Sequence, residues 1–306
     1  MPDSFSPNGN FIRKEVPSFD AIRGIAILLV VAAHAGFGPE QAFSLYPSGV
    51  LGVDIFMVLS GFLIVSALLK DFELCGTIRF KKFYSRRAAR IFPALFSFLL
   101  TCWAISLLFP TLISHDTFVN AGFGALTFSL NLAMVSNCTW WQPLAHLWSL
   151  SLEEQFYLIL PLALALLMRV RSSAVWVGVA AIPIIISIVT RLQGCLMHSA
   201  TDICWNIKLA HGSAAHFIGQ GVGAAFGCLW RFGWVDVHSA RTCNLAKAAI
   251  FSGALYLIAA DLVGLRASCV GLDPICLFTL GLIVVSLNSD TSTVSRFPFF
   301  EHSFLN

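Results

Sequence analysis

Two ionisable side chains in the first apolar stretch, residues 20–37, have types and a spacing suited to proton transfer. Arg23 and His34 are eleven residues apart. On a helix they therefore lie within about 20° of one face and about 16 Å apart along the axis, with Asp20 near the same face. Neutral imidazole is the usual general base near pH 7. The alternative is structural: Arg23 extends to the membrane interface and His34 caps the helix end.

A second polar set lies in the segment HLWSLSLEEQFYLILP, which begins at His146. His146, Ser149, Glu153 and Tyr157 are spaced three, four and four residues apart, so they form one polar stripe on an otherwise apolar helix. Because Glu154 directly follows Glu153, we expect only one of the two to face this stripe. The alternative is a polar helix start at the membrane interface, with the neighbouring tryptophans as an aromatic belt.

Two arginines one helical turn apart, Arg87 and Arg90, close a basic segment of the chain. Their planar guanidinium groups suit phosphate oxygens, although basic residues here also serve simply to fix membrane topology. The second apolar stretch holds one acid, Asp54, ahead of the pair Ser60-Gly61. Asp54 is expected either to pair with Arg23 and offset its desolvation, or to take part in catalysis.

The elements that position these residues are predicted to be membrane-spanning helices. Of the 306 residues, 57% are hydrophobic and 11% charged, whereas a soluble domain carries about 25% charge. Continuous apolar runs of about 20 residues favour helices over a closed barrel. The expected spans are 20–37, 49–69, 91–110, 146–168, 174–191, 209–230, 245–263 and 271–288.

Basic residues concentrate between residues 70 and 90, which we interpret as a loop. This segment holds seven of the nineteen lysines and arginines: Lys70, Arg79, Lys81, Lys82, Arg86, Arg87 and Arg90. The positive-inside rule places this loop and the amino terminus in the cytoplasm.

The sequence leaves undecided whether the apolar residues 118–136 span the membrane. If they span, Arg169 and Arg171 lie outside; if they are re-entrant or interfacial, both lie inside, which the charge rule favours.

Glycines and cysteines add structural expectations. Gly219, Gly223 and Gly227 repeat every four residues and predict a close-packing face for a neighbouring helix. Cys195 and Cys204 share one predicted outer loop, where a disulfide between them is one possibility. The cysteines and histidines form no motif typical of a metal site, so we expect none.

The order of four motifs resembles the acyltransferase 3 family of membrane acyltransferases. The motifs are FDAIRGIAILLVVAAH, GVDIFMVLSGFLI, RRAARIFPAL and HLWSLSLEEQFYLILP, and they cover roughly residues 18–168. The resemblance implies about ten membrane helices. It also implies transfer of acyl groups, most often acetyl, from a coenzyme A thioester to extracytoplasmic glycans and some other acceptors.

The resemblance also implies roles for individual residues. His34 matches the essential histidine of the family and Arg23 the arginine of its first motif. Arg87 and Arg90 match an Arg-x-x-Arg pair associated with the donor, and Glu153 matches the glutamate of the Trp-Ser-Leu-Ser motif. The final helix of the family is not found in this chain.

Together these observations predict an all-α, polytopic transmembrane bundle of about 8–10 helices. Residues 1–18 are expected to form a disordered or interfacial leader, and 19–306 one membrane acyltransferase domain truncated at its carboxyl end. The expected reaction is transfer of acetyl from acetyl-coenzyme A to a glycan hydroxyl at a bacterial inner membrane, with lipopolysaccharide among the polysaccharides considered. His34, Glu153 and Arg23 are the expected catalytic residues, Arg87 and Arg90 would bind the donor, and Asp54, Ser149 and Tyr157 would support them. No permanently bound cofactor or nucleic acid is expected. The alternatives are a lipid, antibiotic or peptidoglycan acceptor, and a transporter.

Overall fold

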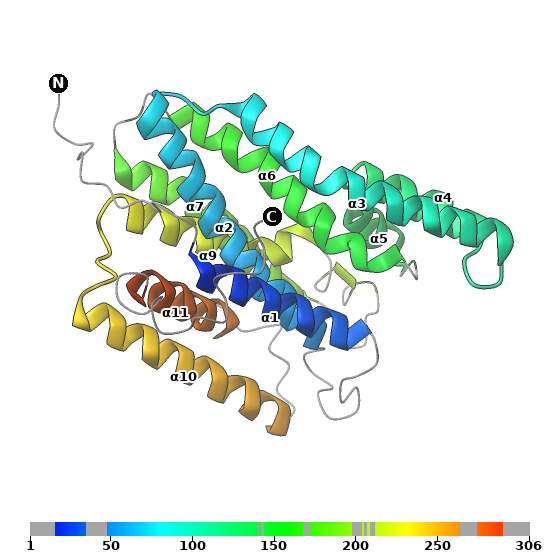
Figure 1. Ribbon diagram of the computed structural model, residues 1–306. Coiled ribbons are helices and arrows are strands. Elements are labelled where there is room, and N and C mark those ends of the chain that lie inside the picture. Colours follow the sequence, from blue (N-terminus) through cyan, green and yellow to red (C-terminus); the bar gives the residue numbers. More distant parts are fainter. Residues whose placement is uncertain are drawn as a thin grey trace. The chain divides into compact units, whose positions relative to one another are not determined.

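The protein is built from α-helices (Figure 1). The computed structural model describes residues 16–34, 48–139, 141, 144–167, 170, 172–197, 204, 207, 208, 212–263 and 274–289, and none of these residues forms a strand. The helices are α1 (Pro17–His34), α2 (Ser48–Cys75), α3 (Phe80–Leu108), α4 (His115–Leu126), α5 (Leu130–Asn137), the 3₁₀ helix η1 (Leu144–Leu147), α6 (Trp148–Leu166), α7 (Ser173–Met197), α9 (Ser213–Arg231), α10 (Ala240–Val263) and α11 (Pro274–Ser289). The all-α prediction is confirmed.

Long apolar helices identify a multi-pass membrane protein. Within the described residues, four stretches are long and apolar enough to cross a bilayer: Leu51–Cys75, Phe80–Leu108, Leu144–Leu166 and Ser173–Gln193. The other predicted spans fold as α1, α9, α10 and the shorter apolar helix α11. Helix α1 begins at Pro17, inside the predicted leader, because proline suits the first helical turn. Residues 1–15 and 290–306 lie outside the described part of the chain.

The chain divides into two compact units, each assembled from segments distant in sequence. One draws on Met1–Ala67, Val170–Ile184 and Gly219–Asn306, and the other on Leu68–Arg169 and Ile185–Ile218. The first unit therefore holds α1, α10, α11 and most of α2 and α9. The second holds α3, α4, α5, η1 and α6.

Helices α2 and α9 of the first unit pack with their backbones in contact. A side chain at Gly223 would collide with backbone atoms of Val58 and Phe62, and one at Gly219 would lie 3.2 Å from the Met57 side chain. Gly227 similarly faces the Phe62 carbonyl at 3.2 Å. The predicted glycine face is thus confirmed: small residues allow the close approach that stabilises helix pairs in membranes.

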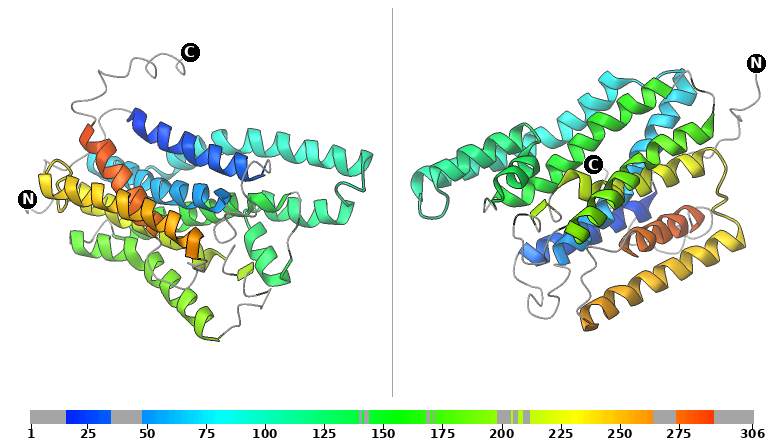
Figure 2. Two further views of the ribbon diagram at one scale, coloured as in Figure 1. Left: turned by 90° about the horizontal axis from the view of Figure 1, so that it is seen from below. Right: turned by 180° about the vertical axis from the view of Figure 1, so that it is seen from behind.

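Aromatic and small residues join the remaining helices of the first unit. The Phe19 ring of α1 meets the Phe62 ring of α2 edge-on, with 5.8 Å between centroids. Helices α10 and α11 lie side by side in Figures 1 and 2. A side chain at Gly253 of α10 would lie 2.7 Å from Phe278 of α11, which explains the glycine at this contact.

In the second unit, α3 and α6 run antiparallel (Figure 1). The Tyr84 hydroxyl near the start of α3 donates to the Tyr157 carbonyl in α6 at 3.2 Å. Further along α3, the Phe98 ring contacts the His146 ring just ahead of α6, with 5.3 Å between centroids. The end of α6 therefore lies on the same side of the unit as the start of α3.

Residues 118–136 form a helical hairpin rather than one span. They divide into α4 and α5, of 12 and 8 residues, with a turn that contains Phe128 at φ 52°. At about 1.5 Å per residue neither helix crosses a hydrocarbon core of about 30 Å. The Phe128 ring in the turn lies 6.0 Å from that of Phe92, near the middle of α3. The structure therefore favours the alternative in which residues 118–136 do not span the membrane but are re-entrant or interfacial, while Arg169 and Arg171 themselves lie outside the described residues.

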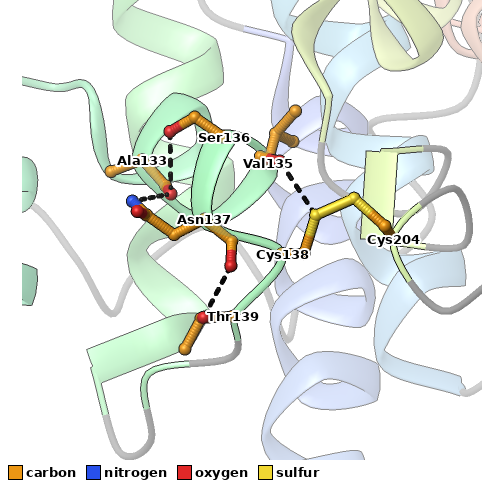
Figure 3. The surroundings of a disulfide bond; sticks show 7 residues. All are labelled: Ala133, Val135, Ser136, Asn137, Cys138, Thr139 and Cys204. Carbon is orange, nitrogen blue, oxygen red and sulfur yellow. Dashed lines mark hydrogen bonds between the residues drawn. A yellow bond between two sulfur atoms is a disulfide. The ribbon is translucent and has the colours of Figure 1, made fainter.

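The disulfide of the second unit joins Cys138 to Cys204, whose Cα atoms are 4.9 Å apart (Figure 3). The possible pairing of Cys204 with Cys195 is therefore not the one that forms. Cys138 follows α5 and adopts a left-handed conformation at φ 50°, which ends that helix. The partners are 66 residues apart in sequence, so sharing a predicted loop was no guide to proximity in space.

The basic segment 70–90 is helical rather than a loop. Helix α2 continues to Cys75, Gly76–Arg79 form the turn, and α3 begins at Phe80. Lysine and arginine are good helix formers, so a helix extends past the apolar residues that mark the membrane span. An ion pair between Arg79 and Asp71 closes the turn, and this hydrogen-bonded carboxylate raises the pKa of Arg79.

Candidate active site

A charged cluster between α3 and α6 is the most developed polar site among the described residues. The Arg87 guanidinium lies 2.5 Å from a carboxylate oxygen of Glu154 and 3.9 Å from one of Glu153. It also lies over the Tyr157 ring, 3.3 Å from the centroid. The Tyr157 hydroxyl donates a hydrogen bond to Glu153. We call these four residues the Arg87 cluster.

Local helix geometry brings the Arg87 cluster together. Glu153 and Tyr157 are four residues apart on α6 and therefore share a face, as the sequence predicted. Arg87 lies one turn after Tyr84 on α3, on the side that packs against α6. Because α3 and α6 are antiparallel, Arg87 arrives beside the first half of α6.

Glu153 faces the predicted stripe, where the Tyr157 hydroxyl donates to it, whereas Glu154 pairs with Arg87 of α3. Arg87 lies between the two acids, and it is Glu154, not Glu153, that makes the shorter ion pair. Neighbouring residues on a helix point about 100° apart, and a long arginine between them can reach both. The sequence offered no signal for this, because the partner is 67 residues away from Glu154.

The electrostatics of the Arg87 cluster are unusual for a membrane helix. One guanidinium faces two carboxylates, and their side chains are only 23%, 14% and 15% exposed for Arg87, Glu153 and Glu154. Charged residues at such positions are costly, so they face partners and mark functional sites. The ring of Tyr157 offers the cation its electron-rich face, which partly replaces lost water.

Arg90 occupies a different environment from Arg87. It is exposed on α3, whereas Arg87 is turned towards α6. Three residues on a helix correspond to a rotation of about 300°, so Arg90 lies about 60° around the helix from Arg87.

The remaining residues of the predicted stripe lie at the start of α6. His146 belongs to η1, and its ring contacts that of Phe98. The Ser149 hydroxyl donates to the His146 carbonyl at 3.3 Å and so caps local backbone. His146 and Ser149 thus belong to the start of α6, while Glu153 and Tyr157 belong to the Arg87 cluster.

The predicted residues of the first unit are placed in part. Arg23 forms an ion pair with Asp20 one turn earlier on α1, at 2.5 Å. Asp54 is buried on α2, 6% exposed. His34 is the last residue of α1, and its side chain lies outside the described part of the chain.

A second polar network on α6 was not anticipated from the sequence. The Gln155 amide donates to the carbonyl of Phe128 and to the Asn131 side chain, both at 2.8 Å. The Asn131 amide donates to the Ser213 hydroxyl at 2.8 Å, and that hydroxyl donates back to Gln155 at 2.5 Å. We call Asn131, Gln155 and Ser213 the amide ring. A glutamine next to two acids in an apolar helix was the available signal.

The amide ring has a structural role that its geometry makes clear. It satisfies the carbonyl of Phe128, a residue in the non-helical turn of the α4–α5 hairpin. Irregular backbone at membrane depth is tolerated only where protein groups satisfy its hydrogen bonds.

Among the described residues no group of three histidine, cysteine or acidic side chains has an arrangement that would hold a metal ion.

The family model described as "Acyltransferase domain", Acyl_transf_3, matches residues 16–298. The peptidoglycan O-acetyltransferase OatA of Listeria monocytogenes is 34% identical over 174 residues, which are 52% of this chain and 26% of that protein. A putative O-acetyltransferase of Staphylococcus aureus (strain COL) is 34% identical over 167 residues, 50% of this chain and 25% of its own length. The putative peptidoglycan O-acetyltransferase YrhL of Bacillus subtilis is 32% identical over 173 residues, 52% and 25% of the two chains.

These matches cover about a quarter of the length of the curated relatives. No solved structure matches the chain at a significant level. The family model, however, extends over nearly all of the sequence, from just before α1 to beyond α11. The protein, a multi-pass helical membrane protein with an ionic cluster between α3 and α6, therefore belongs to the acyltransferase 3 family.

Proposed function

We propose that the protein transfers an acetyl group from acetyl-coenzyme A to a hydroxyl group of an extracytoplasmic glycan. The single observation that carries this proposal is the Arg87 cluster, a half-buried arrangement of one guanidinium and two carboxylates in the membrane helices of an acyltransferase domain. The relatives named as peptidoglycan O-acetyltransferases favour a cell-wall glycan over lipopolysaccharide as the acceptor.

The proposed reaction is an acyl transfer between a thioester and an alcohol. His34 accepts the proton of the acceptor hydroxyl as its oxygen attacks the thioester carbonyl; the carbon–sulfur bond then breaks and the coenzyme A thiol leaves with a proton. In the relay variant, His34 first carries the acetyl group itself and then passes it to the hydroxyl. Arg23, ion-paired with Asp20 on the same helix, supports His34.

Within this proposal Glu153 of the Arg87 cluster binds the acceptor or orients the His34 imidazole, and Arg87 and Arg90 bind the phosphates of the donor. A carboxylate fixed by Tyr157 and Arg87 is a good hydrogen-bond acceptor for sugar hydroxyls, and Glu153 is held by both. The expected alternative, in which Glu153 orients the His34 imidazole, uses the same fixed carboxylate.

Two alternative functions can be distinguished from the proposed one by experiment. A transporter would move its substrate without an acyl donor, and an acyltransferase with a lipid or antibiotic acceptor would leave cell-wall glycans unmodified. Mass spectrometry of wall glycans from a deletion strain tests the proposal. We expect loss of acetyl ester signals that returns with the wild-type gene and does not return with Glu153→Gln. Unchanged acetylation in the deletion strain would contradict the glycan acceptor.

A further inference from the structure

Gln220, in the first half of α9, is a buried amide with no hydrogen-bond partner among the described residues. Its side chain is 0% exposed, and neither the amide oxygen nor the amide nitrogen is hydrogen-bonded. An amide left unpaired in an apolar interior destabilises the folded state. A methionine of similar shape at this position would avoid that cost, so packing alone does not account for the glutamine.

Other buried polar side chains of this protein do find partners. The Gln155 amide, in the amide ring on α6, donates to the Phe128 carbonyl and to Asn131 at 2.8 Å, and it accepts from a serine hydroxyl. The Ser60 hydroxyl on α2 donates to a backbone carbonyl of its own helix at 3.0 Å. Gln155 is therefore an internal reference for Gln220: the same side chain, satisfied in one place and unsatisfied in the other.

Close helix packing within the first unit fixes the backbone around Gln220. A side chain at Gly61 of α2 would collide with the Gln220 carbonyl, and one at Gly221 would lie 2.9 Å from Ile184 of α7. Gln220 lies seven residues after Ser213, or about 10 Å along a helix of about 28 Å. The amide is thus held deep in the helical bundle, away from both ends of α9.

We infer that the Gln220 side chain binds a secondary amide group of a substrate. This inference rests on the proposed function. A glutamine amide has one strong acceptor and two donors. It is satisfied most completely by a group that presents both a carbonyl and an N–H, because its oxygen and its nitrogen are then both bonded. A carboxamide does not exchange protons near neutral pH, so Gln220 binds and orients the substrate and is not a general base.

Both substrates of the proposed reaction carry such a group. The pantetheine arm of coenzyme A contains two secondary amides, and the amino sugars of peptidoglycan carry N-acetyl groups. A buried polar side chain that pairs with a substrate group also discriminates strongly against an analogue without that group. Gln220 therefore gives the site a preference for substrates with an amide, and experiment distinguishes the donor from the acceptor as its source.

Gln220→Met keeps the approximate shape of the side chain and removes the amide. Thermal unfolding in detergent without substrate should give a melting temperature equal to or above that of wild type, because an unsatisfied group is lost. Gln155→Met is the matched control and should lower the melting temperature, since it breaks the amide ring. In the reconstituted whole protein, Gln220→Met should weaken one substrate by about tenfold.

Two measurements on Gln220→Met identify the source of the amide. A raised Kd for coenzyme A in isothermal titration assigns it to the donor. A raised KM for an N-acetylated glycan with an unchanged Kd for coenzyme A assigns it to the acceptor. In that case an acceptor with glucose in place of N-acetylglucosamine should be used equally well by wild type and variant.

Two results would overturn the inference alone, while wild type still transfers acetyl groups. One is a melting temperature lowered as in Gln155→Met, which would make Gln220 a structural residue. The other is a Gln220→Met variant in which both the Kd for coenzyme A and the KM for the glycan stay within about twofold of wild type. A wild-type protein that transfers no acetyl group would instead overturn the proposed function, and this inference with it.

Discussion

Tyr157 makes two separate contributions to the Arg87 cluster, and each comes from a different part of its side chain. Its ring lies 3.3 Å from Arg87, and its hydroxyl hydrogen-bonds to Glu153. The cation–π interaction of the ring with the desolvated guanidinium stabilises it by about 1–2 kcal/mol. The hydroxyl fixes the orientation of a carboxylate. A single residue thus links the cation and the acid proposed to act on substrate.

Tyr157→Phe keeps the ring and removes only the hydroxyl. We expect the variant to fold normally and to lower turnover by about tenfold, since the misoriented Glu153 loses about one hydrogen bond of roughly 1.4 kcal/mol. Tyr157→Leu removes the ring as well and should also lower the melting temperature in detergent. Turnover assays with thermal unfolding of both variants measure this. Equal activity of wild type and Tyr157→Phe would show that the hydroxyl has no part in function.

Residue-level roles were only partly predictable from the sequence. The pairing of Glu153 with Tyr157 followed from their spacing, because a helix fixes the face of residues four apart. The ion pair between Arg87 and Glu154 did not, because it depends on how two distant helices align. The His34 assignment remains a prediction from sequence and resemblance.

At the scale of elements, the α4–α5 hairpin is the feature most dependent on side-chain polarity. Its turn is stabilised by the amide ring, which joins α5 and α6 to the start of α9 within the second unit. The disulfide from Cys138 to Cys204 holds the other end of α5. Asn131 lies in the first turn of α5 and Cys138 directly follows its last residue, so the two links hold opposite ends of the helix.

Gln155→Leu should destabilise this hairpin. The change leaves the Phe128 carbonyl and the partners in the amide ring unsatisfied, at a cost on the order of 1–3 kcal/mol. Thermal unfolding in detergent should report a lower melting temperature. Leu158→Met, on the same helix but 58% exposed, is the control and should have little effect. A Gln155→Leu variant as stable as this control would mean that the amide ring does not support the hairpin.

Hydropathy predicted where the helices lie in the sequence, but not where they begin or end beside charged residues. Continuous apolar runs predicted the segments that became α1, α2, α3, α6, α7, α9, α10 and α11. The predicted spans ended before the end of α2 and began after the start of α3. The charged helical turns at the membrane surface have low hydropathy, so hydropathy alone does not distinguish them from loops. The disulfide partner of Cys204 was missed because sequence proximity says little about tertiary contact.

For the whole molecule, the α4–α5 hairpin gives the relative sides of the helix ends in the second unit. The start of α3 and the end of α6 lie on one side, and the end of α3, the end of α5 and the start of α6 on the other. Basic residues at the start of α3 favour the cytoplasm for the first side. A disulfide near the second favours an oxidising compartment. Both arguments, from independent chemistry, give the same orientation.

Thiol labelling of intact cells tests this orientation. In a background without other free thiols and with the disulfide kept, a membrane-impermeant reagent should label Ser136→Cys but not Lys81→Cys, because both positions are exposed but on opposite sides. Gln41→Cys, which lies outside the described residues, should behave like Ser136→Cys. Labelling at 81 without labelling at 136 would invert the topology, and labelling at both would show that the hairpin does not return.

The most direct measurement is transfer of labelled acetyl from acetyl-coenzyme A to a wall-glycan acceptor by the whole protein reconstituted in lipid. We expect donor-dependent transfer by the wild-type protein. His34→Gln should lower it by about 10²–10⁴-fold and Glu153→Gln should also lower it, while both bind coenzyme A with a Kd within about twofold of wild type. Near wild-type transfer by both variants, or substrate movement without any donor, would contradict the account.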